Sequence, residues 1–241
     1  MKGITMLKLI VFDLDNTLAK IGKGITPADI ALLKKIEEQD ITIAICSGKP
    51  VIYLCGFMRQ VGLKHPILIG ENGAVIQFGV DLPPKQYYRL PYSEVAKRTL
   101  AFIQKQIDEK LPDVWYQPNM VGVTPFPKSE TEFVIIEELL EENKLNLEDV
   151  EVYRHADSFD IVPVGIDKRR GLEYLAKLLN ISEQEIMAVG DGVNDYPMFE
   201  YAGRSIGIHV KEPNRVDENF LTITQALEYI LEVSRKIERN S

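Results

Sequence analysis

Short runs of apolar residues alternate with segments of helical periodicity in the first third of the chain. Near-continuous apolar runs of this kind are typical of parallel strands that are covered on both faces. The predicted elements, in chain order, are a strand at 7–12, a helix at 27–39, a strand at 41–46, a helix at 50–60 and a strand at 67–70. This order predicts a βαβαβ unit with right-handed crossovers.

The pattern changes after Phe78, where the segment GVDLPPKQYYRLP is rich in proline and aromatic residues. Strands and helices then stop alternating one by one. The predicted elements are a strand at 86–90, a helix at 94–110, two strands around 117–119, a helix at 130–143 and two strands on either side of 156–157. A β-α-β-β-α-β pattern with an extra strand indicates a compact α+β domain.

The first pattern returns from residue 164 onward. It predicts a helix at 168–179, a strand at IMAV (186–189), a short helix after Asn194, strands at SIGI (205–208) and FLTI (220–223), and a helix from Gln225. The fold class is therefore α/β, with a Rossmann-like, doubly wound parallel sheet as its core. We place the core at residues 1–80 and 164–241 and the inserted α+β domain at 81–163.

Composition narrows the possible partners. The 241 residues are 45% hydrophobic and 27% charged, an ordinary balance for a folded protein, and the formal net charge is −8. The absence of a long Lys/Arg cluster argues against nucleic acid or an anionic membrane as the main partner. No stretch approaches the roughly 20 apolar residues of a membrane span, so we expect a cytoplasmic protein.

Polar residues and glycines follow each predicted core strand. In an open parallel sheet, ligands bind beyond the carboxyl ends of the strands, so these residues are candidates for the site. They are Asp13 and Asp15; Ser47 and Gly48; Glu71, Asn72 and Gly73; and Gly190, Asp191, Asn194 and Asp195. Each group also has a structural explanation: DLDNT could cap a turn, and Asn72-Gly73 is typical of a type I′ turn. The combination favours a functional site.

Four carboxylates at one sheet edge would repel one another unless a cation lay among them. Oxygen ligands without His or Cys suit Mg²⁺, and the scattered His65, His155 and His209 fit no zinc pattern. The expected metal-binding residues are Asp13, Asp15, Asp191 and Asp195. The expected phosphate-binding residues are Ser47, Gly48, Lys168 and Asn194, because hydroxyl, ammonium, amide and glycine N–H groups donate to anions.

With these motifs in place, the sequence resembles the haloacid dehalogenase-like superfamily of phosphohydrolases. The matching residues, in the order of that family's four motifs, are Asp13-Leu14-Asp15-Asn16-Thr17, Ser47, Lys168 and Gly190-Asp191-Gly192-Val193-Asn194-Asp195. The insert is similar to a type IIB cap, which implies a role in substrate specificity. CSGKP and GENGAVI are similar to segments of Cof-like sugar-phosphate phosphatases and archaeal-type phosphoglycolate phosphatases.

The resemblance implies a Mg²⁺-dependent phosphatase that hydrolyses a small phosphorylated metabolite, a sugar phosphate or a phosphoglycolate-like ester. Asp13 would be the nucleophile and Asp15 the general acid and base. The expected catalytic residues are Asp13, Asp15, Ser47 and Lys168, with Asn72 and Arg154 as candidates for substrate binding. Tyr116, Gln117 and His155 are further candidates in the insert.

Two positions depart from the family pattern. Asn16 stands where many relatives have Gly, and Asn tolerates the same left-handed backbone. Lys49 stands where many type IIB members have Arg, which removes a bidentate fork near the substrate. A phosphotransferase or phosphomutase that uses the same phosphoenzyme, and a non-catalytic phosphometabolite sensor, remain alternatives. A dehalogenase is disfavoured, because Asp15 has no use in expelling a halide.

Overall fold

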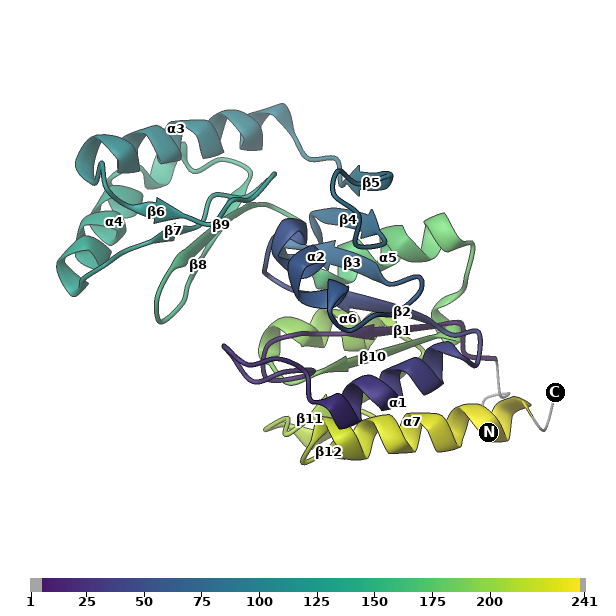
Figure 1. The fold of residues 1–241 in the computed structure, drawn as a ribbon. Coiled ribbons are helices and arrows are strands. Elements are labelled where there is room, and N and C mark those ends of the chain that lie inside the picture. Colours follow the sequence, from purple (N-terminus) through teal and green to yellow (C-terminus); the bar gives the residue numbers. More distant parts are fainter. Residues whose placement is uncertain (1–5, 239–241) are drawn as a thin grey trace. The chain divides into compact units, whose positions relative to one another are not determined.

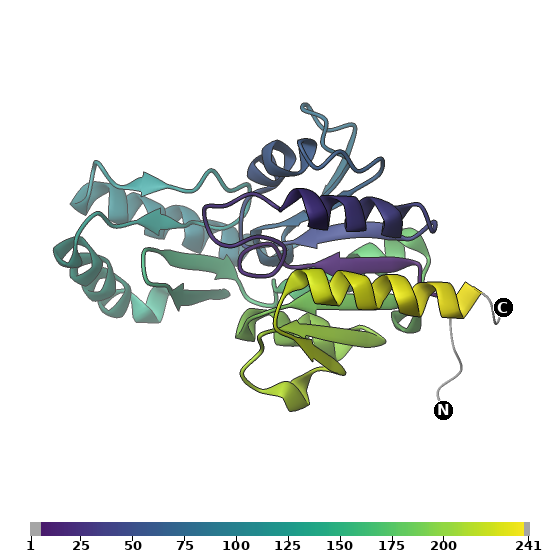
Figure 2. The ribbon, with the colours of Figure 1, turned by 60° about the horizontal axis from the view of Figure 1, so that its bottom comes forward.

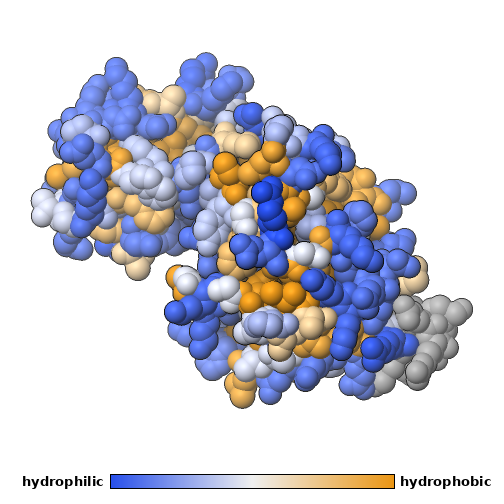
Figure 3. Space-filling model, in the orientation of Figure 1, coloured by the Kyte–Doolittle hydropathy of each residue, from blue (hydrophilic) through white to orange (hydrophobic). Residues whose placement is uncertain are grey.

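The computed structural model describes residues 6–238 of the chain. The described residues form two compact units, one within Met1–Tyr88 and Asp167–Ser241 and the other Arg89–Ile166. Among the described residues, no helix is both long enough and apolar enough to cross a membrane. Figure 3 shows polar residues over much of the visible surface, with smaller hydrophobic areas between them.

The first unit is built on an eight-stranded sheet in the order β12-β11-β10-β1-β2-β3-β4-β5 (Figure 1). Neighbours from β12 to β3 are parallel, and β4 runs antiparallel to β3. The strands are β1 (Leu9–Phe12), β2 (Thr42–Cys46), β3 (Ile67–Gly70), β4 (Val75–Phe78), β5 (Gln86–Arg89), β10 (Ile186–Gly190), β11 (Arg204–Ile208) and β12 (Glu218–Phe220). The doubly wound α/β fold predicted from the sequence is confirmed.

Helices cover both faces of this sheet. On one face, α1 (Pro27–Glu37) lies beside α7 (Ile223–Glu238), and on the other α5 (Lys168–Leu179) lies beside α6 (Tyr196–Tyr201) (Figures 1 and 2). Helix α2 (Val51–Arg59) packs against β3. Central strand β1 is fully enclosed, with all four side chains from Leu9 to Phe12 at 0% exposure. This buried sheet holds the strand ends at fixed spacing.

The second unit is a small α+β domain. Its elements are α3 (Glu94–Lys110), β6 (Trp115–Tyr116), β7 (Pro125–Phe126), α4 (Glu130–Glu142), β8 (Val150–Arg154) and β9 (Phe159–Pro163). β6 pairs with β7 and β8 with β9, and a bridge between Val123 and Ile161 joins the two pairs. Ser93 and Ser129 accept hydrogen bonds from Ala96 N and Glu132 N, so each helix begins with a side-chain cap.

Short 3-10 segments occur at five connections: η1 (Glu71–Gly73), η2 (Lys144–Asn146), η3 (Glu183–Glu185), η4 (Val193–Asp195) and η5 (Pro213–Arg215). η1 follows β3 directly, and η4 follows β10 after Asp191 and Gly192. They therefore lie at the edge of the sheet where the polar motifs gather.

Two details differ from the sequence prediction. Strand β5 belongs to the core sheet, so the units divide after Tyr88 and Ile166, whereas we predicted boundaries after residues 80 and 163. The proline-rich segment is a connection within the core. Strands β6 and β7 lie on either side of residues 117–119, as the sequence predicts. The last strand ends at Phe220, because Leu221 is 73% exposed and an apolar side chain alone does not extend a strand.

Candidate active site

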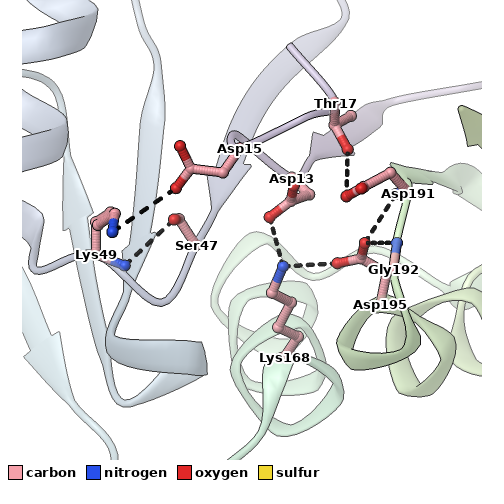
Figure 4. Close-up of polar contacts among 9 residues, drawn as sticks. All are labelled: Asp13, Asp15, Thr17, Ser47, Lys49, Lys168, Asp191, Gly192 and Asp195. Carbon is pink, nitrogen blue, oxygen red and sulfur yellow. Dashed lines mark hydrogen bonds and ion pairs between the residues drawn. The ribbon is translucent and has the colours of Figure 1, made fainter. Parts of the chain in front are cut away.

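Asp13 and Asp15 diverge because the chain turns sharply after β1. Asp13 N donates to Val189 O at 2.8 Å, which continues the sheet for one residue. The loop then closes on itself: Asn16 N donates to Ala19 O at 2.7 Å, and Asn16 adopts φ 64°. That φ confirms the left-handed backbone expected of Asn16. Figure 4 shows the Asp13 side chain directed toward Lys168 and the Asp15 side chain directed toward Lys49 and Ser47.

Lys168 is the cationic centre of a buried cluster. It is the first residue of α5, and the Asp167 side chain caps the helix by accepting from Arg170 N at 2.7 Å. Lys168 Nζ donates to Asp13 Oδ1 and to Asp195 Oδ1, each at 2.6 Å, and the Lys168 side chain is 1% exposed. A lysine at the start of a helix is usually solvated, so the burial of Lys168 sets it apart from an ordinary surface lysine.

Burial dominates the acid–base properties of this cluster. It would lower the pKa of Lys168, but the Asp13 and Asp195 carboxylates overcome this effect and raise the pKa, so the ammonium stays charged. Burial raises the pKa of Asp13 to about 7; Lys168 opposes the shift, and Asp195 adds to it. Burial and then Asp195 also raise the pKa of Asp191. Additional positive charge at this position would favour the ionised carboxylates.

The loop after β10 is organised by Asp195. Its Oδ2 accepts from Asp191 N at 2.9 Å and Gly192 N at 3.0 Å, while its Oδ1 accepts from Lys168. A side chain at Gly190 would occupy the space of the Asp195 carboxylate, which explains the glycine at the end of the strand. Asn194 is exposed in the same loop. Asp195 therefore joins the loop to Lys168.

The carboxylates fit a hard cation. Asp13, Asp191 and Asp195 each offer an oxygen within 4.8 Å of the others, and the oxygen-only set suits Mg²⁺. The described hydrogen bonds to Asp13 and Asp191 use only Oδ1 of each, with Thr17 Oγ1 donating to Asp191 at 3.3 Å. Because both oxygens of Asp195 are engaged, Asp13 and Asp191 are the better ligands, and Asp195 is better suited to positioning.

Ser47 begins a compact loop that is held against the β3–β4 turn. Lys49 N donates to Ser47 Oγ at 3.2 Å, and Ser47 is buried. Asn72 N donates to Ser47 O, and Glu71 N donates to Lys49 O, both at 3.0 Å. A side chain at Gly48 would lie 3.3 Å from the Asn72 amide, so Asn72 is beside this loop. Residues 71–74 connect β3 to β4 through a 3-10 segment in which Glu71 and Asn72 have positive φ, so the left-handed pair lies one residue before the predicted Asn72-Gly73 turn. The same connection supports the Ser47 loop.

Lys49 and Asp15 form the exposed part of the site. Lys49 Nζ lies 4.0 Å from Asp15 Oδ2, and the two side chains are 38% and 29% exposed. Figure 4 shows this pair on the opposite side of Asp13 from Asp191. The core residues predicted from the sequence therefore gather at one edge, as a buried cluster and an exposed acid–lysine pair.

Arg154 has a different environment, within the second unit. Its Nε donates to Glu137 Oε1 at 2.6 Å, and its guanidinium stacks 4.9 Å from the centre of the Phe133 ring. Tyr116 donates to Asp108 at 2.9 Å. These contacts give both side chains a role in the packing of their own domain.

Sequence reasoning missed two features of the site. Thr17 orients Asp191, although its place in DLDNT was noted. Gly73 and Gly171 come so close that a side chain on Gly171 would lie 2.6 Å from Gly73 Cα. A glycine inside the periodic pattern of 168–179 was the available signal for this close approach. The contact sets the start of α5, and therefore Lys168, against the turn that supports Ser47.

Comparison with known proteins agrees with this geometry. A family model described as haloacid dehalogenase-like hydrolase matches residues 10–121 and 117–220. The phosphoglycolate phosphatase of Methanococcoides burtonii is 26% identical over 203 residues, 84% of each chain. The 5-amino-6-(5-phospho-D-ribitylamino)uracil phosphatase of Escherichia coli is 24% identical, covering 84% of this chain and 85% of that protein.

Solved structures share the fold. A haloacid dehalogenase-like hydrolase from Bacteroides thetaiotaomicron superposes with a TM-score of 0.74 at 20% identity, covering 93% of this chain and 99% of that one. A sugar phosphatase of HAD subclass IIB gives a TM-score of 0.66 at 21% identity, over 92% and 98%. Sheet and site define a Rossmann-like enzyme with a carboxylate centre. The chain belongs to the haloacid dehalogenase-like hydrolase family, which confirms the resemblance.

Proposed function

We propose that the protein is a Mg²⁺-dependent phosphatase that hydrolyses small phosphomonoesters through an aspartyl-phosphate on Asp13. The observation that carries this proposal is the divergence of Asp13 and Asp15: one loop presents a carboxylate paired with Lys168 and a second, partly exposed carboxylate. A nucleophile and a separate proton donor are the two groups that the reaction needs. Family membership and phosphatases among the relatives support this assignment.

In the first half-reaction, an Asp13 carboxylate oxygen attacks phosphorus and the bond to the ester oxygen breaks. The leaving oxygen takes a proton from Asp15. In the second half-reaction, water attacks the phosphorus of the aspartyl-phosphate, and Asp15 takes a proton from that water. The acyl-phosphate bond breaks, inorganic phosphate leaves, and Asp13 is regenerated as a carboxylate.

Charge repulsion is the main obstacle to the first step. A carboxylate about 4 Å from a phosphate dianion is repelled by about 8 kcal/mol at an effective dielectric constant near 20. Lys168 offsets part of this repulsion and keeps Asp13 oriented. Mg²⁺ bound by Asp13 and Asp191, with the Asp15 backbone carbonyl, would supply the remaining positive charge at the transferring phosphoryl group.

The Ser47 loop would hold the phosphoryl oxygens. Because Ser47 Oγ accepts from Lys49 N, its hydroxyl hydrogen remains for a substrate oxygen. The Gly48 backbone N–H and the Asn194 amide would add donors. In this proposal the inserted domain acts as a type IIB cap that selects the leaving group, and Asn72 contacts the substrate at the edge of the core.

The decisive experiment combines hydrolysis with trapping. The protein is given a panel of phosphomonoesters with Mg²⁺, and acid-quenched samples are mapped by peptide mass spectrometry. We expect inorganic phosphate to be released and a hydroxylamine-labile phosphate to appear on Asp13. Phosphate released by Asp13→Asn at the normal rate would contradict the nucleophile assignment. Addition of glycerol separates hydrolysis from transfer, because a phosphotransferase would form glycerol phosphate.

A further inference from the structure

Two lysines of the site differ in what they can reach. Lys168 is buried and forms ion pairs with Asp13 and Asp195, so its positive charge is used to balance these two carboxylates. Lys49 is 38% exposed, and its Nζ lies 4.0 Å from Asp15, too far for a hydrogen bond. Among residues 6–238, the contact found for its ammonium is this long ion pair, which a stronger anionic partner can displace.

The backbone of Lys49 is nevertheless fixed. Its N–H donates to Ser47 Oγ and its carbonyl accepts from Glu71 N. Gly70 permits this packing, since a side chain there would come within 2.9 Å of Lys49 O. Lys49 thus combines an anchored main chain with an adjustable four-carbon side chain beside Asp15. This combination suits recognition of a substrate group of variable position.

Under the proposed function, Asp15 lies within hydrogen-bond reach of the leaving oxygen, roughly 3 Å away. Since Lys49 Nζ is 4.0 Å from Asp15 Oδ2, it lies no more than about 7 Å from that oxygen. A carboxylate on the carbon attached to the ester oxygen falls in the same region. Rotation of the Lys49 side chain would let it bind this carboxylate without moving Asp15.

The charge of the leaving group determines how much it is stabilised by Lys49. The site already contains Asp13, Asp15, Asp191 and Asp195, so a substrate with a carboxylate beside its phosphate adds further repulsion. Lys49 is the exposed cation described next to the leaving-group acid, and it would offset this repulsion. A neutral alcohol carries no such charge and gains less from the ammonium.

We propose that Lys49 is a specificity-determining residue that favours phosphate esters of α-hydroxy acids over phosphate esters of neutral alcohols. This inference rests on the proposed function, in which Asp15 protonates the leaving oxygen. It gives a role to Lys49, which stands where many type IIB members have Arg.

The test compares 2-phosphoglycolate with 2-hydroxyethyl phosphate, which is similar in size but lacks the carboxylate. The measured quantity is the ratio of the two kcat/KM values. For Lys49→Met we expect this ratio to fall about tenfold to a hundredfold, the range for losing one charge-assisted hydrogen bond. Lys49→Arg should keep most of the preference, and added salt should reduce it in the unmodified protein. Lys35→Met, an exposed lysine of α1, is the matched control.

Two results would contradict different parts of the argument. An unchanged ratio in Lys49→Met, even with both rates reduced, would overturn the specificity role, because Lys49 would then only orient Asp15. If the unmodified protein with Mg²⁺ hydrolyses neither ester and leaves p-nitrophenyl phosphate intact, the proposed function itself fails. The two failures are distinguished by activity of the unmodified protein toward p-nitrophenyl phosphate.

Discussion

Lys168 Nζ lies 2.6 Å from Asp195 Oδ1, and both side chains are enclosed by the core. The other oxygen of Asp195 accepts two backbone N–H groups of the loop after β10. A change at Lys168 therefore acts on stability as well as on chemistry. Lys168→Met leaves two buried carboxylates without a cation, and we expect it to lower the free energy of unfolding by about 3–5 kcal/mol. Urea unfolding at pH 8 measures this.

The double variant Lys168→Met/Asp195→Asn isolates the cause. It removes one of the uncompensated charges, while the Asn oxygen can still accept from Asp191 N and Gly192 N. We therefore expect it to be more stable than Lys168→Met alone, although inactive. A double variant that is less stable than the single one would show that packing around Lys168, and not charge, sets the loss.

Asp13→Asn should change how stability depends on pH. In metal-free protein, the folded state holds the Asp13 proton up to about pH 7, whereas the unfolded chain releases it near the ordinary value of 3.8. Between these values the unfolded state binds fewer protons, so the free energy of unfolding decreases as pH rises, by at most about 1.4 kcal/mol per unit. Asp13→Asn lacks this loss and should be the more stable protein at pH 8. If the free energy of unfolding, measured in EDTA, depends on pH in the same way for the two proteins, burial does not raise the pKa of Asp13.

The sequence was sufficient for the fold and for the prediction that the candidate residues of the core gather at one edge of the sheet. Its apolar runs gave the buried strands, and the residues that follow them meet at one sheet edge because parallel strands end together. It could not show which oxygen of each carboxylate is engaged, because that depends on contacts such as Asp195 with Gly192, set by loop geometry. It also could not show that Arg154 packs against Phe133 and pairs with Glu137, since an arginine that stacks within its domain has the same sequence signal as one that binds substrate.

Asp15→Asn should slow hydrolysis according to the leaving group. General-acid help is worth about 10²–10⁴ for a poor leaving group and much less for a good one. We expect a severe loss with an alkyl phosphate and a smaller loss with p-nitrophenyl phosphate, whose anion leaves without protonation. Steady-state kinetics with both esters measures the difference. Equal losses on the two esters would remove the assignment of Asp15 as the acid, and a melting curve checks that the fold is intact.

Metal removal should distinguish ligands from supporting residues. EDTA should abolish hydrolysis and Mg²⁺ should restore it. In the proposed site Asp191 is a Mg²⁺ ligand, so in Asp191→Asn the Mg²⁺ concentration for half-maximal rate should rise by at least about tenfold more than in Asp195→Asn, which chiefly disturbs Lys168. Titration of the rate with Mg²⁺ measures both. If Asp195→Asn needs the higher concentration, Asp195 is a ligand, and the assignment from its hydrogen bonds is wrong.

Alanine substitutions at Gly73 and Gly79 test whether the contact between Gly73 and the start of α5 positions Lys168. Both have positive φ, 109° and 76°, so an alanine strains the backbone at either position. Only at Gly73 would the new side chain overlap the Asp167 carbonyl at the start of α5; nothing lies within 4 Å at Gly79. Gly79→Ala should cost about 1–2 kcal/mol and leave kcat near normal, whereas Gly73→Ala should cost more and also lower kcat by displacing Lys168. Chemical unfolding and kcat of the two variants measure this, and equal effects would show that strain alone, without the contact to α5, explains the glycine.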